Sequence, residues 1–120
     1  MDKQFFFTIG IITVSDKGSK GERQDESGPM IEKMLNPLGG IVKEYTIMPD
    51  EKEDIKATMK RMSDELKVDA IFTSGGTGFS IRDITPEATM EVIDRLAPGI
   101  PEAMRAESLK ITPKAMLSRA

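Results

Sequence analysis

The chain has 120 residues, a length typical of one domain built around one hydrophobic core, which we expect to span residues 1–120. It contains no cysteine and no histidine, which excludes disulfides, thiolate nucleophiles, imidazole bases and metal sites built on either residue. The formal charge of −3 arises from 17 Lys and Arg against 20 Asp and Glu spread along the chain, so no nucleic-acid partner is predicted. Any chemistry must use carboxylates, Arg, Lys, hydroxyls, the lone Tyr45, backbone amides or an oxygen-bound ion such as Mg²⁺.

The first predicted element is a strand at residues 5–14, where the chain is continuously apolar and rich in β-branched and aromatic residues. This run is too short to span a bilayer and lacks the basic start and small-residue cleavage site of a signal peptide. We therefore expect a cytoplasmic protein with no membrane partner. Residues 15–26 break the pattern and predict a loop.

Two strand–helix units follow. Met30, Ile31, Met34 and Leu35 recur at helical spacing behind Pro29, and a second strand is expected at residues 41–48. Asp50 with Glu53 three residues on resembles a capping box, and it precedes a helical stripe that contains Met59 and Met62. We assign Met30, Met34, Met59 and Met62 to the core.

A third strand is expected at residues 68–73, followed by a glycine-containing loop at 74–84. Thr85 is expected to cap a helix that carries Ala88, Val92 and Leu96 on one face, and Pro101 and Pro113 each indicate a further short helix. This order predicts a three-layer α/β/α fold with a mostly parallel, Rossmann-like sheet. Ligands of such sheets bind beyond the carboxyl ends of the strands.

Three segments are expected to converge at that edge: Ser15-Asp16, Pro49-Asp50-Glu51, and Thr73-Ser74-Gly75-Gly76-Thr77-Gly78 continuing to Arg82-Asp83. The glycines allow sharp turns and leave backbone N–H groups open to an anion, with no Cβ to crowd it at Gly76. The loop is neither a Walker loop nor a dinucleotide fingerprint. Carboxylates, glycines and an arginine at one edge together predict an anion and Mg²⁺ site.

Each charged candidate also has a structural interpretation. Asp83 is either a Mg²⁺ ligand or the start of an Asx-turn before Thr85, and Asp50 is either a Mg²⁺ ligand or the N-cap of the second helix. Arg82 either clamps a phosphate or is an ordinary solvated arginine.

The segments Ile9–Asp16, Asp25–Pro29, Pro49–Glu51 and, above all, Ser74–Gly78 with Arg82–Thr89 resemble the MogA/MoaB family of molybdenum cofactor biosynthesis. The resemblance implies a molybdopterin-binding α/β fold that adenylylates molybdopterin with Mg-ATP and releases pyrophosphate. It places the two catalytic aspartates of the family on Asp50 and Asp83, and the ligand site on the glycine loop. It also implies trimers or hexamers, and a chain shortened at its C-terminus that lacks a last strand.

Other functions stay open at this stage. A binding module that holds molybdopterin without turning over ATP would use the same residues. The metal-insertion branch of the superfamily is disfavoured by the short chain. A receiver-type signalling module is disfavoured because the third strand ends in Thr73-Ser74-Gly75-Gly76 and not in aspartate.

Overall fold

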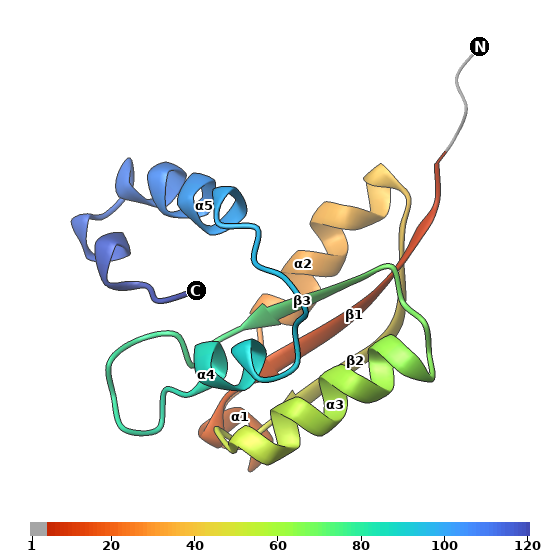
Figure 1. The fold of residues 1–120 in the computed structure, drawn as a ribbon, viewed down its shortest axis with the longest axis horizontal. Coiled ribbons are helices and arrows are strands. Elements are labelled where there is room, and N and C mark those ends of the chain that lie inside the picture. The colour runs from red at the N-terminus through yellow and green to blue at the C-terminus, as the bar shows by residue number, and fades with distance from the viewer. Residues whose placement is uncertain (1–4) are drawn as a thin grey trace.

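Three parallel strands form the sheet of the computed structural model, which describes residues 5–120. They are β1 (Phe7–Val14), β2 (Gly40–Met48) and β3 (Ala70–Ser74), arranged in the order β2-β1-β3. The strands lie in the three predicted places, and all three carboxyl ends meet at one edge of the sheet (Figure 1).

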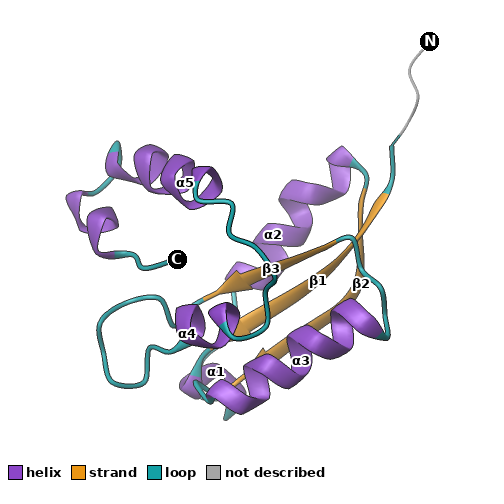
Figure 2. Ribbon diagram, viewed as in Figure 1, coloured by secondary structure: helices purple, strands orange, loops and turns teal. Residues whose placement is uncertain are grey.

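Helices cover both faces of this sheet, as the α/β/α prediction requires. Helix α2 (Ser27–Leu35) lies on one face, and α3 (Lys52–Asp64) with α4 (Thr85–Met90) lies on the other (Figure 2). Since successive side chains of a strand point to opposite faces, Ile12 and Val14 of β1 pack toward α3.

The α3 face holds a close-packed apolar core. Ile55, Met59 and Met62 are buried against β1 and β2, which confirms the core assignment of both methionines. The packing leaves little room, because a Cβ added to Gly10 would lie 2.5 Å from the sulfur of Met62. This packing holds α3 in place on the sheet. It thereby also positions Asp50 and Glu51, which immediately precede α3.

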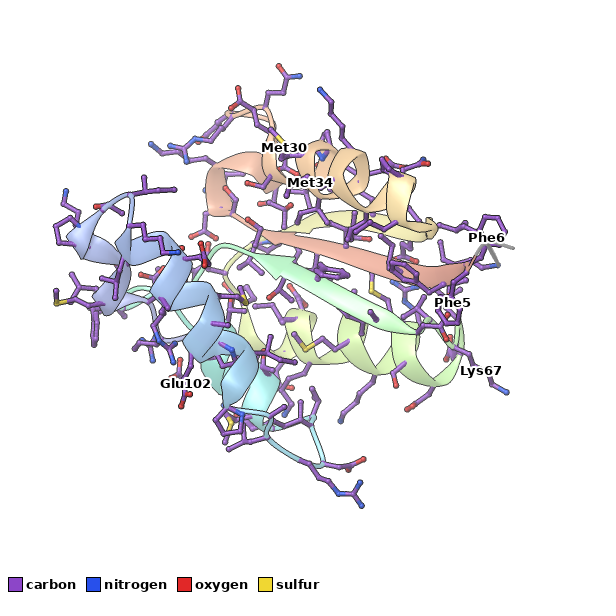
Figure 3. All side chains as sticks on the ribbon, turned by 90° about the horizontal axis from the view of Figure 1, so that it is seen from above. Phe5, Phe6, Met30, Met34, Lys67 and Glu102 are labelled. Atoms are coloured by element: carbon purple, nitrogen blue, oxygen red, sulfur yellow. The ribbon has the colours of Figure 1, made fainter. Side chains whose placement is uncertain are left out.

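The core assignment of Met30 and Met34 was wrong. Their side chains on α2 are 56% and 66% exposed (Figure 3). The residues of α2 that turn toward the sheet are Gly28, Ile31 and Leu35, and the 100° turn per residue leaves Met30 and Met34 outside the arc that these three cover.

A short helix follows β1. Residues 16–19, expected as loop, form α1 (Asp16–Ser19), because the Ser15 hydroxyl caps it by accepting a bond from the Gly18 N–H at 3.0 Å. A 3₁₀ turn, η1 (Asn36–Leu38), precedes β2. Helix α4 is shorter than predicted: it ends at Met90, so Val92 and Leu96 lie beyond it, and Leu96 is exposed. Helix α5 (Gly99–Leu109) packs on η2 (Pro113–Leu117) away from the sheet (Figure 1).

Within residues 5–120, no helix combines the length and apolar character needed to cross a bilayer.

Candidate functional site

Asp16 and Asp50 meet at the carboxyl edge, where β1 and β2 end. The Asp16 N–H donates to Asp50 Oδ2 at 3.1 Å, and the Asp50 N–H donates to Asp16 Oδ1 at 2.9 Å. This reciprocal pair joins residues 34 positions apart, as the parallel topology predicts. The two loops are therefore tied together by the carboxylates that sequence reasoning singled out.

Arg82 reaches this pair from the loop after β3. Its Nε and Nη2 donate to the two Asp16 carboxylate oxygens at 3.0 and 2.8 Å, and its Nη1 donates to Glu51 Oε1 at 2.9 Å. The guanidinium holds the pKa of Asp16 at about 2. Arg82 is thus not a free solvated arginine, and we call Asp16, Asp50, Glu51 and Arg82 the Arg82 cluster. The sequence pointed to Glu51 only as part of the segment Pro49–Glu51, and Glu51 was not among the predicted site residues.

Asp50 is not the N-cap of the helix that follows it. The N-cap is Glu51, whose side chain makes no capping bond, while the Asp50 carboxylate is directed at the Asp16 amide. Burial raises the pKa of Asp50, and the negative charges of Asp16 and Asp83 raise it further. The charges of Asp16 and Asp83 therefore lie close enough to oppose the ionisation of Asp50, and a carboxyl group with a raised pKa is typical of a functional site.

The glycine loop, residues 74–78, is held by close contacts within the protein. Gly75 and Gly76 have φ of +95° and +70°. A Cβ on Gly75 would lie 2.2 Å from the Val14 carbonyl oxygen, and one on Gly76 would lie 2.3 Å from the Thr85 hydroxyl. On sequence grounds, the glycine at position 76 was expected because a Cβ there would crowd a ligand. The structure shows that a Cβ would already collide with the protein's own Thr85 hydroxyl.

Thr85 fixes this loop from α4. The prediction that it caps the helix was wrong, because Ile84 is the N-cap. The buried Thr85 hydroxyl donates instead to the Gly75 carbonyl at 2.9 Å, and the Thr85 N–H donates to the Gly76 carbonyl at 3.1 Å. Over residues 5–120, the N–H groups of residues 76–78 donate no hydrogen bond, so the loop has amides to offer an anion.

Asp83 lies across the glycine loop. Its Oδ2 accepts a bond from the Ser80 N–H at 2.9 Å and would be 2.8 Å from a Cβ on Gly78. The carboxylate thus bonds an earlier residue and starts no turn before Thr85. Among residues 5–120, no group of three or more acidic side chains is arranged to hold a metal by itself. A Mg²⁺ ion at Asp50 and Asp83 would need further oxygen ligands, such as phosphates.

A cleft of about 470 Å³ lies beside the Arg82 cluster. The predicted residues Ser15, Ser74 and Gly75 line it, whereas Asp16, Asp50, Arg82 and Asp83 do not.

Asp25 also lines this cleft, and its carboxylate accepts bonds from the Thr13 hydroxyl at 2.8 Å, the Gly28 N–H at 3.1 Å and the Tyr45 hydroxyl. Those bonds keep the pKa of Asp25 low although burial opposes them. Sequence reasoning noted Asp25 only as part of the family resemblance.

The sequence is similar to those of known proteins. Residues 10–120 match the family described as probable molybdopterin binding domain. The molybdopterin adenylyltransferases of Helicobacter pylori strain J99 and Escherichia coli K12 are 43% and 40% identical to the chain, over 92% of its length. The chain spans 64% and 58% of the length of these two relatives.

Solved structures agree. The molybdopterin biosynthesis enzyme MoaB from Thermus thermophilus superposes with a TM-score of 0.89 at 46% identity, covering 95% of this chain and 72% of that one. The tungsten cofactor synthesizing protein MoaB from Pyrococcus furiosus gives 0.78 at 39% identity, covering 93% and 69%. The chain therefore belongs to the molybdopterin-binding-domain family of molybdenum cofactor biosynthesis.

Proposed function

We propose that this chain carries the reaction edge of a molybdopterin adenylyltransferase. The observation that supports this most is the meeting of Asp50, Asp83, Arg82 and the open amides of residues 76–78 at one edge of the sheet. These groups suit a phosphate-rich substrate and have no role in the hydrophobic core. The names and 40–43% identity of the two relatives point to the same activity.

Asp50 and Asp83 would hold the Mg²⁺ that accompanies ATP, and both would act in catalysis. Carboxylate oxygens suit this ion, which commonly takes one or two protein carboxylates and completes its shell with phosphate and water. When bound, Mg²⁺ neutralises charge on the phosphate oxygens. The raised pKa of Asp50 is consistent with a site where a cation would relieve repulsion among carboxylates.

The remaining predicted residues would bind the two substrates, molybdopterin and ATP. Arg82 already grips the two oxygens of the Asp16 carboxylate with two N–H groups, and a phosphate presents a similar pair of acceptors. Ser15, Ser74 and Gly75 line the neighbouring cleft. The N–H groups of Gly76, Thr77 and Gly78 would donate to phosphate oxygens, with Asp16 holding Arg82 in place.

The reaction needs no imidazole or thiol. The terminal phosphate of molybdopterin, whose second pKa is about 6, is largely ionised at neutral pH. One of its oxygens would attack the α-phosphorus of ATP and form a new P–O bond. The bond between the α-phosphorus and pyrophosphate would break, and pyrophosphate would leave with the electron pair. Alignment and charge stabilisation by the edge residues then supply the catalysis.

We also propose that the chain acts in the cytoplasm, where ATP is supplied, and assembles as a trimer or hexamer. The exposed apolar side chains of Phe5, Phe6, Met30 and Met34 are consistent with an assembly (Figure 3). Light scattering should give a multiple of 13.2 kDa, and a dilute monomer would contradict the oligomer.

Pyrophosphate release tests the proposed function. The chain is incubated with ATP and molybdopterin, with and without Mg²⁺, and we expect release that requires all three components. Pterin binding without any release would contradict an adenylyltransferase and favour the non-catalytic binding module.

A further inference from the structure

Arg119, near the end of η2, is bonded to the loop that carries Arg82 and Asp83. Its Nε donates to the Gly78 carbonyl at 2.7 Å and its Nη2 donates to the Asp83 carbonyl at 2.7 Å. Its backbone N–H donates to the Thr77 carbonyl at 3.0 Å. One residue therefore binds both ends of the segment 77–83, from a position 36 residues beyond Asp83.

The same guanidinium connects this segment to α4. Nη1 of Arg119 lies 2.5 Å from Glu87 Oε2, and the guanidinium carbon lies 5.5 Å from the centre of the Phe79 ring. The Arg119 side chain is only 28% exposed. Four partners thus contact one planar guanidinium, namely two backbone carbonyls, a carboxylate and an aromatic ring, and a lysine cannot reproduce this geometry.

Apart from the bonds of Arg82 to Asp16 and Glu51, the segment 77–83 has little other support. Its large apolar side chains, Phe79 and Ile81, are 72% and 98% exposed, so they do not anchor it to the core. Its internal bonds join only Ser80 and Asp83. The segment nevertheless delivers Arg82 to the Arg82 cluster and Asp83 toward Asp50. The contacts of Arg119 with this segment can therefore set the alignment of the Arg82 and Asp83 side chains.

We propose that Arg119 is a positioning residue that holds segment 77–83, and with it Arg82 and Asp83, in the alignment required for adenylyl transfer. The inference rests on the proposed function for its catalytic part. Its structural part, the ordering of the segment, stands on the contacts alone. A role in general stability predicts a different result, because it would loosen the whole fold and not this segment.

The test compares Arg119→Met, which removes the fork, with Arg119→Lys, which keeps the charge. Arg95→Met, a change at an exposed arginine after α4, is the control. Amide hydrogen exchange is measured at Ser80 and Asp83, whose N–H groups are bonded within the segment, and along β1. We expect about tenfold faster exchange at both positions in Arg119→Met, a smaller increase in Arg119→Lys, and parental exchange in β1 and in the control.

Kinetics of pyrophosphate release form the second readout. We expect the kcat of Arg119→Met to fall by about tenfold or more with the KM for ATP changed by less than about twofold, since a misaligned site loses rate more than binding. Parental exchange at Ser80 and Asp83, exchange that rises equally in β1, or an unchanged kcat would overturn the proposal. If the parent chain releases no pyrophosphate, the proposed function fails, while the exchange data still decide whether Arg119 orders the segment.

Discussion

The Arg82 cluster and the glycine loop lie at the same edge of the sheet but are held in different ways. The cluster is built from charged side chains, and that of Arg82 is 51% exposed. The glycine loop is fixed by backbone contacts against Val14 and by Thr85, which is only 2% exposed. Exposed ion pairs contribute little to stability, so their side chains can exchange one partner for another. Close backbone contacts do not permit such an exchange. One side of the edge can therefore rearrange around a ligand while the other presents fixed amides.

The largest effect is expected from a methyl group in the fixed side. Gly76→Ala places a Cβ 2.3 Å from the Thr85 hydroxyl at a φ of +70°, so we expect the free energy of unfolding to fall by about 2–3 kcal/mol. Urea denaturation measures this. The matched control is Gly99→Ala, where no heavy atom lies within 4 Å of the added Cβ. Equal stabilities of the two variants would show that the loop is not fixed as described.

The next effect is expected on activity at the charged side. Asp50→Asn and Asp83→Asn keep the size of each side chain and one oxygen that can accept the backbone N–H bond it receives, but they remove the charge that would bind Mg²⁺. We expect pyrophosphate release to fall by about tenfold or more. Stability should stay within about 1 kcal/mol of the parent, since neither change creates a cavity or strain. Parental turnover in both variants would remove the two aspartates from the mechanism.

Asp50 also predicts a dependence of stability on pH. Burial raises its pKa in the folded chain, so the folded state binds this proton more tightly than the unfolded state does. Ionised Asp50 therefore costs stability once the pH rises above its ordinary pKa of 3.8. We expect Asp50→Asn to gain stability relative to the parent between about pH 3 and pH 7, with most of the gain just above the ordinary carboxyl pKa. A difference that does not change with pH in urea titrations would contradict a raised pKa.

The smallest effect concerns Asp16, whose pKa the Arg82 guanidinium lowers to about 2. The stabilising contribution of this pair is complete above the ordinary pKa of 3.8 and is lost as the pH falls toward 2. Carbon NMR of the carboxyl group should show the pKa rising toward 3.8 in Arg82→Met. Lys20→Met, which removes the weakest of the groups that lower this pKa, should shift it little. A low pKa that persists without Arg82 would mean that other groups cause the shift.

The sheet and the general location of the site could be predicted from the sequence. Runs such as Ile9–Val14 are apolar on both faces, and parallel strands bring their carboxyl ends together whatever the loops contain. The same regularity predicted that Asp16 and Asp50 lie at this edge, because each stands two residues after the end of a strand.

The specific partners could not be predicted. Thr85 has the sequence context of a helix cap, yet its hydroxyl bonds the Gly75 carbonyl, a contact that depends on how two loops pack. Met30 and Met34 follow helical spacing, yet both are exposed on α2. The spacing alone does not say which side of the helix faces the sheet, so their exposure could not be predicted from it. Arg119 contacts a loop that lies 41 residues earlier in the chain at Gly78, and no local pattern signals that contact.

A ligand titration followed by NMR tests most directly whether the two sides form one site. Mg-ATP is added to the chain with and without molybdopterin, and the amides of residues 76–78 are followed together with those of Asp16 and Asp50. We predict that both groups of amides shift with the same apparent Kd, and that the shifts require Mg²⁺. Shifts confined to one side, or shifts on the two sides with different Kd values, would contradict a single phosphate-binding site at this edge.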